Sequence, residues 1–147
     1  MKEDDGVGPY VASILGGQDA EGIRSEAAVR VQAIDCGTTP ENHTSTIRRV
    51  HPDVLVIVDA AEMGLAPGDC RIIPVEQAGA LGLSTHSMPL SLFASYVREM
   101  AGSIVLIGVQ PRRMAFGVCL SGEVRQAGQA LASMLLQGRL GELDALD

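Results

Sequence analysis

The chain of 147 residues is poor in aromatic side chains, with no Trp, two Tyr and two Phe. Binding of single-stranded nucleic acid by stacking needs exposed aromatic rings, so this class of site is not expected. Hydrophobic residues nevertheless make up 46% of the chain. The core must therefore consist mainly of Val, Ile, Leu, Ala and Met, and a chain of this length can bury one such core.

Basic residues are also few. Eleven Lys and Arg stand against 18 Asp and Glu, which gives a formal net charge of -7. A phosphate backbone would be repelled, so no nucleic acid partner is predicted. The apolar run over residues 54–58 is far shorter than the about 20 residues of a membrane-spanning helix, and no signal-like segment opens the chain. We therefore predict a cytoplasmic protein without membrane insertion.

Motifs for covalent catalysis and for phosphate binding are missing. The three cysteines, Cys36, Cys70 and Cys119, are widely spaced and odd in number, which favours reduced thiols over disulfides or a paired metal motif. G-x-S-x-G, G-x-G-x-x-G and the P-loop pattern do not occur. If the chain is a hydrolase, its chemistry is expected to use carboxylates and a metal ion.

Alternating strand and helix patterns indicate a three-layer α/β sandwich in a single domain, residues 1–147. Helices are predicted over residues 9–16, 40–50, 89–100 and 122–136, the last capped by Ser121, and strands over residues 27–34, 54–58, 70–74 and 103–107. Residues 18–25 and 75–88 are expected to be loops, and the acidic tail from residue 138 is expected to fray.

Three of these elements have distinctive patterns. The continuous apolar run over residues 54–58 is typical of a strand buried on both faces, whereas the strand over residues 70–74 ends in Pro and suits a sheet edge. The helix over residues 89–100 has an apolar stripe consisting of Leu92, Phe93, Tyr96 and Val97.

Polar residues at strand ends are candidates for function, because ligands bind beyond the carboxyl ends of the strands in open α/β sheets. Asp59 follows the apolar run directly, and it either serves such a site or caps the next turn. For Asp35, the following Cys36-Gly37 favours a role in a turn. For Asp4 and Asp5, the sequence alone favours a solvated acidic turn. His86 stands alone before a helix, where a structural or surface role is the commoner one.

Seven short motifs occur in order between residue 4 and about residue 136. They are Asp4-Asp5-Gly6-Val7-Gly8-Pro9, Thr39-Pro40-Glu41-Asn42, Ile57-Val58-Asp59-Ala60, Met63-Gly64, Pro67-Gly68, Thr85-His86-Ser87-Met88-Pro89-Leu90 and Gly108-Val109-Gln110-Pro111. Taken together, they resemble the motifs of the nickel-iron hydrogenase maturation endopeptidases, and most closely those of the branch that serves the hydrogenase of formate hydrogenlyase.

The resemblance implies an α/β/α sandwich with a mixed sheet and a metal-sensing site formed by Asp5, Asp59 and His86. Oxygen and imidazole donors suit a divalent ion such as nickel, and three ligands leave coordination positions open. In this family the nickel belongs to the substrate, a hydrogenase large-subunit precursor whose C-terminal extension is removed after nickel insertion. Asp5 and Asp59 are the implied catalytic carboxylates, one of them acting as general base.

The chain departs from the family pattern at its start. The family has a short apolar strand before the Asp-Asp-Gly segment, whereas Met1 and Lys2 stand there in this sequence. We expect the first strand of the family to be absent through N-terminal truncation, with a gap between the strands over residues 27–34 and 54–58. Unpaired strand edges associate, so self-association is also expected.

The resemblance leaves two alternatives to an active endopeptidase. One is a non-catalytic nickel-sensing assembly factor that uses Asp5, Asp59 and His86 as its sensor. The other is an inactive, truncated family member. Processing of a nickel-loaded precursor, compared with a nickel-free precursor, separates these possibilities.

Overall fold

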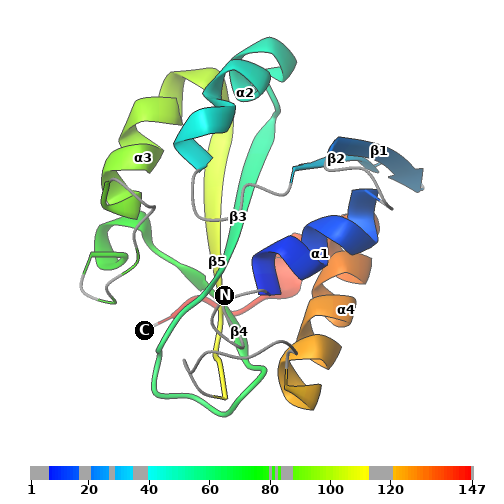
Figure 1. Ribbon diagram of the computed structural model, residues 1–147, viewed down its shortest axis with the longest axis vertical. Coiled ribbons are helices and arrows are strands. Elements are labelled where there is room, and N and C mark those ends of the chain that lie inside the picture. The colour runs from blue at the N-terminus through cyan, green and yellow to red at the C-terminus, as the bar shows by residue number, and fades with distance from the viewer. Residues whose placement is uncertain are drawn as a thin grey trace.

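The computed structural model of the protein describes residues 7–16, 21–26, 29–34, 40–79, 81, 83, 88–112 and 121–146. Asp59 lies within this part of the chain, whereas Asp5, Asp35 and His86 lie outside it. The elements are arranged as helices on both faces of a twisted sheet (Figure 1).

The central sheet has the strand order β3-β5-β4. Strand β3 (Val54–Ala60) runs parallel to β5 (Ser103–Val109), and β4 (Cys70–Ile73) runs antiparallel to β5. Because parallel strands need a crossover, the chain passes through α3 (Leu90–Val97) on its way from β3 to β5. The predicted mixed sheet is confirmed, and so is the edge position of β4 within it.

A second, two-stranded sheet consists of β1 (Glu21–Glu26) and β2 (Val29–Ile34), which pair antiparallel. The prediction of a loop over residues 18–25 was therefore wrong for β1. Its sequence, EGIRSE, lacks the alternation of apolar and polar residues that marks a strand, and its register comes from pairing with β2. The predicted strand over residues 27–34 is confirmed, because β2 occupies Val29–Ile34.

Strand β3 is less buried than its apolar sequence predicted. Within the described residues it pairs only with β5, and β2 lies in the other sheet. Val54 is exposed, the residues from Leu55 to Asp59 are half-buried, and Ala60 is buried. Both faces of β3 are covered, as expected, but most of its side chains are only half-buried, and one long edge of β3 has no strand beside it among the described residues. The absence of the family's first strand stays a prediction.

A strand edge with apolar side chains and no paired strand among the described residues predicts association through β3. Val54→Lys places a charge at the start of this edge, where Val54 is 44% exposed, and should weaken self-association several-fold with a stability change within about 0.5 kcal/mol. Sedimentation velocity over a concentration series measures the effect. Val50→Lys is the matched control, because Val50 is 41% exposed but lies on helix α2 (Thr44–Val50). Equal effects of both substitutions would contradict an edge contact.

The helices form the two outer layers of the predicted sandwich, which is confirmed. Helices α1 (Val7–Gly16) and α4 (Gly122–Leu136) lie on one face of the sheet, and α2 and α3 lie on the other (Figure 1). Short 3-10 turns flank α2 and α3, namely η2 (Pro40–His43) and η4 (Arg98–Met100). Ser121 caps α4 as predicted, because its Oγ accepts a hydrogen bond from the Val124 N–H at 3.4 Å.

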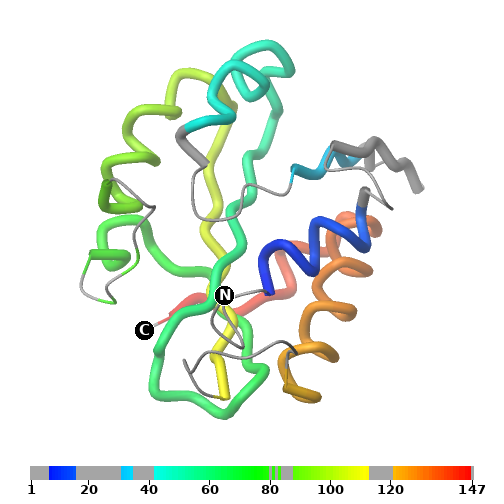
Figure 2. Tube along the Cα trace, in the orientation of Figure 1, coloured from blue at the N-terminus to red at the C-terminus, as the bar shows by residue number. Residues whose placement is uncertain are grey.

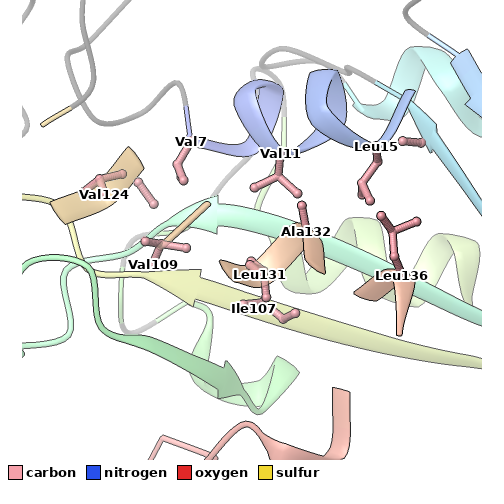
Figure 3. Close-up of a cluster of buried hydrophobic side chains, with 11 residues drawn as sticks. Val7, Val11, Leu15, Ile107, Val109, Val124, Leu131, Ala132 and Leu136 are labelled. Atoms are coloured by element: carbon pink, nitrogen blue, oxygen red, sulfur yellow. The ribbon is translucent and has the colours of Figure 1, made fainter. Parts of the chain in front are cut away.

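The core between α1, α4 and the sheet is aliphatic. Val7, Val11 and Leu15 of α1 face Val124, Leu131, Ala132 and Leu136 of α4, with Ile107 and Val109 of β5 beneath them (Figure 3). Along β3, Val56 and Val58 pack on this cluster, whereas Leu55 and Ile57 pack on a second cluster beneath α2 and α3. This alternation is the period-2 pattern of a strand between two helical layers.

The residues of helix α3 that are buried in the core differ in part from the predicted apolar stripe. Phe93 and Val97 are buried as expected, and Leu90 and Ala94 complete the buried face. Leu92 and Tyr96 are 56% and 57% exposed. The four predicted residues cover a wider arc of the helix than the sheet can contact, so two of them remain in solvent.

The C-terminal segment does not fray over residues 140–146, and the prediction of a frayed tail was wrong for them. After η5 (Leu140–Glu142), Ala145 forms a parallel bridge with Ile72 of β4. The red C-terminal trace in Figure 2 runs from the end of α4 back across the sheet. The Ile72 N–H donates to Asp144 O at 2.9 Å, and the Leu146 N–H donates to Ile72 O at 2.8 Å. Leucines spaced three apart in this segment supply the apolar contacts that its acidic composition concealed.

Candidate active site

Asp59 is the penultimate residue of β3 and pairs in register with Gly108 of β5. Its side chain is half-buried, and its Oδ1 accepts a hydrogen bond from the Ala60 N–H at 2.9 Å. This contact is the local turn interaction that one interpretation of the sequence expected. It uses one of the two carboxylate oxygens, and Asp59 also lies at the carboxyl end of the strand, where an α/β protein places its ligands.

The strand-end loop, residues 61–69, follows Asp59 and is held against the end of β5. The Ala61 N–H donates to Val109 O at 3.0 Å, and the Gly68 N–H donates to Gln110 O at 2.9 Å. Gly108 has no side chain at this crossing, and a Cβ there would come within 2.4 Å of Ile73 Cδ1 and 3.0 Å of Ala61 Cβ. The loop therefore packs closely on β5 beside Asp59.

The first turn of α1 lies against β3 next to Asp59. Val7 is fully buried, and a Cβ on Gly8 would come within 2.6 Å of Val58 O. Only glycine allows this approach of helix backbone to strand backbone. Asp5, a predicted site residue, precedes this turn and lies outside the described residues.

The residues that flank the His86 segment, Leu83 and Leu90, pack on the face of β3 opposite to α1. The Leu90 N–H donates to Leu83 O at 3.2 Å, so residues 83 and 90 are neighbours. Both leucines are buried in the cluster that contains Ala61, and Met63 and Met88 pack against it. His86 itself lies outside the described residues, so its predicted role as a ligand stays a prediction.

Cys70 is a free, half-buried thiol in β4, as the prediction of reduced cysteines expected. Burial raises the pKa of the Cys70 thiol, the Asp69 carboxylate raises it further, and the Arg71 charge opposes both. Its Sγ donates to Gly68 O at 3.6 Å. A thiol with a raised pKa is protonated near neutral pH and is a poor nucleophile. Cys36 and Cys119 lie outside the described residues.

Sequence reasoning assigned no role to Gln110, although the motif Gly108-Val109-Gln110-Pro111 contains it. Gln110 follows β5 directly, is 3% exposed, and contacts the strand-end loop through both its backbone and its side chain. A polar residue directly after an apolar strand was the available signal, the same one that drew attention to Asp59.

Within the described residues, no three His, Cys, Asp or Glu side chains lie close enough together to hold a metal ion. Because Asp5 and His86 lie outside these residues, the set of Asp5, Asp59 and His86 stays a prediction. No helix in the described part of the chain has both the length and the apolar composition to cross a membrane.

Comparison with known proteins identifies the family. The family model described as hydrogenase maturation protease matches residues 20–138. The hydrogenase 3 maturation protease of Escherichia coli strain K12 is 33% identical over 136 residues, which cover 92% of this chain and 82% of that protein.

Solved structures agree with this match. The endopeptidase HycI from Escherichia coli superposes with a TM-score of 0.79 at 30% identity, covering 100% of this chain and 90% of that one. The NiFe hydrogenase maturation protease HycI from Thermococcus kodakarensis has a TM-score of 0.75 at 31% identity, covering 94% and 85%. The chain therefore belongs to the hydrogenase maturation protease family, and its activity is that of a peptidase.

Proposed function

We propose that this peptidase removes the C-terminal extension from the nickel-loaded large-subunit precursor of a nickel-iron hydrogenase. Asp5, Asp59 and His86 complete the coordination of the nickel ion, which the substrate supplies. The protease thereby recognises the metal, and a precursor without nickel is not cleaved. The hydrogenase 3 maturation protease of Escherichia coli, a relative at 33% identity, supports a substrate of this class.

The observation that carries the proposal is the meeting of three chain segments at the carboxyl end of β3. Asp59 ends this strand, and the first turn of α1, two residues after Asp5, abuts Val58 O. Leu83 and Met88, on either side of His86, pack in the same cluster as Ala61. Asp5 thus precedes a segment at this end of β3 by two residues, and His86 lies in the sequence between two residues of the cluster that contains Ala61, which supports the proposal.

The chemistry of these side chains fits the reaction. Two carboxylates and an imidazole are ligands for a borderline divalent ion, and they leave positions for the substrate's own ligands. Holding the ion also fixes the scissile peptide near Asp5 and Asp59, one of which takes a proton from a water molecule. The water oxygen bonds to the peptide carbonyl carbon, the C–N bond breaks, and the proton passes to the leaving amine.

The formal net charge of -7 supports a protein substrate rather than nucleic acid, because a phosphate backbone would be repelled. We propose that processing takes place in the cytoplasm. The large-subunit precursor is the partner, and no membrane insertion is required.

Incubation of the purified chain with nickel-loaded and with nickel-free precursor tests the function. We expect mass spectrometry to show loss of the C-terminal extension only from the loaded precursor. Nickel-dependent binding without cleavage would establish the non-catalytic assembly factor instead. Cleavage of both precursors at the same rate would overturn the proposed recognition of nickel.

A further inference from the structure

Gln110 has an unusually complete set of hydrogen bonds for one buried side chain. Its Oε1 accepts from the Met63 N–H at 2.7 Å and from the Leu65 N–H at 3.2 Å. Its Nε2 donates to Glu62 Oε1 at 3.0 Å and to Pro111 O at 3.2 Å. The amide therefore uses its two acceptor and two donor positions together, which only Asn and Gln side chains can do.

The backbone of Gln110 holds the far end of the strand-end loop. Its N–H donates to Asp69 O at 2.8 Å, and its carbonyl accepts from the Gly68 N–H at 2.9 Å. Glu62 contributes a further contact, because its Oε1 also accepts from the Gly64 N–H at 3.2 Å. One residue thus fixes the loop at its beginning, middle and end, through side-chain contacts 45 to 48 residues away in sequence and backbone contacts to Gly68 and Asp69.

The strand-end loop is directly connected to Asp59. It begins two residues after Asp59, whose Oδ1 is held by the Ala60 N–H. Its Met63 packs against the cluster that contains Ala61, Leu83 and Leu90. A change in the loop is therefore expected to displace the Asp59 carboxylate.

We propose that Gln110 is a positioning residue of the protease, which acts through the strand-end loop to fix the Asp59 carboxylate at the carboxyl end of β3. The role of Asp59 rests on the proposed function. The hydrogen bonds of the Gln110 side chain go to the loop and to Pro111 O, so its effect on Asp59 is through geometry. Misplacement of reacting groups by about 1 Å can cost about 100-fold in rate, which makes such a residue important for turnover.

Two substitutions separate positioning from simple support of the fold. Gln110→Met keeps the length of the side chain but removes all four hydrogen bonds. Gln110→Glu keeps the acceptor for Met63 and Leu65 but places a carboxylate beside Glu62 and Pro111 O. For both we expect kcat for the nickel-loaded precursor to fall about 10- to 100-fold at nearly constant KM.

The pH profile distinguishes the two variants. Burial and the Glu62 carboxylate raise the pKa of a carboxyl group at this position, so the carboxyl of Gln110→Glu becomes protonated as the pH falls. The protonated form again donates a hydrogen bond. The kcat of Gln110→Glu relative to wild type should therefore rise between pH 8 and pH 6, whereas that of Gln110→Met should stay flat.

Leu136→Ala is the stability control. Leu136 is buried beside Leu15, at the end of the cluster away from Val7 and Val109 (Figure 3). Truncation of its side chain should therefore lower Tm without changing the strand-end loop. Its kcat at a temperature where the protein is folded should equal that of wild type. A loss of kcat in Leu136→Ala as large as in Gln110→Met would show that the rate follows stability and would overturn the proposal.

Amide hydrogen exchange tests positioning without any substrate. In Gln110→Met, exchange should accelerate at Met63 and Leu65 and also at Ala60, whose N–H holds Asp59 Oδ1. In Leu136→Ala these three amides should exchange as in wild type. Unchanged exchange at Ala60 in Gln110→Met would overturn the proposal, whatever the fate of the proposed proteolytic function. Failure of wild type to cleave the loaded precursor, with faster Ala60 exchange in Gln110→Met, would overturn the function alone.

Discussion

Asp59→Asn is expected to lower processing of the nickel-loaded precursor at least about 100-fold, because it removes a negative ligand and a candidate general base from the end of β3. The fold should survive. An Asn side-chain oxygen can still accept the hydrogen bond from the Ala60 N–H, which Asp59 Oδ1 accepts at 2.9 Å. Precursor cleavage followed by mass spectrometry, beside thermal unfolding, measures both effects.

Asp53→Asn is the control for this substitution. Asp53 precedes β3 at its other end, and its side chain is exposed. The same change of charge there should leave processing unchanged. Wild-type processing by Asp59→Asn would remove Asp59 from the site. A large fall in Tm with proportionate loss of activity would favour the interpretation of Asp59 as a cap of the following turn.

His86→Ala is expected to abolish processing with little change in Tm. The resemblance assigns His86 as the imidazole ligand, and a ligand for the substrate's ion contributes to the complex rather than to the core. The ends of the His86 segment are held together by a backbone hydrogen bond from the Leu90 N–H to Leu83 O, and both leucines are buried. The substitution leaves this bond intact because no side chain takes part in it. Rates of precursor cleavage and unfolding curves are the two measurements.

His43→Ala provides the comparison, because His43 lies in η2 before α2 and has no predicted role in the site. It should process the precursor at the wild-type rate. Unimpaired turnover in His86→Ala would refute the ligand role. A collapse of stability in His86→Ala, but not in His43→Ala, would indicate a structural histidine.

The sequence predicted those elements of the fold whose residues carry strong local signals. β3 and β5 are continuous apolar runs, and α4 has a serine cap and helical periodicity, so their types and most of their boundaries follow from pattern alone. β1 could not be predicted, because its polar sequence becomes a strand only through pairing with β2. The division of the α3 stripe between core and solvent depended on where the sheet lies beneath the helix.

The candidate site divides in the same way. Asp59 was predictable from physical reasoning, since a charged residue directly after a buried strand is placed at the functional edge of the sheet. Asp5 and His86 entered only through resemblance to the family. A role for Gln110 could not be predicted, because its side-chain partners in the strand-end loop lie 45 to 48 residues away in sequence. No local sequence pattern indicates which loop this side chain contacts.

The docking of residues 140–146 has a consequence for synthesis of the protein. Leu140 and Leu143 pack on the cluster beneath α1 and α4, whereas Leu146 packs on the cluster beneath α2 and α3. These leucines are translated after every residue that they contact. Domains begin to fold from the N-terminus during translation, yet both layers at the β4 edge remain uncovered until this segment leaves the ribosome. Docking of the segment joins the two layers across β4, and a nascent chain that still lacks residues 144–146 has no partner from this segment for the Ile72 backbone.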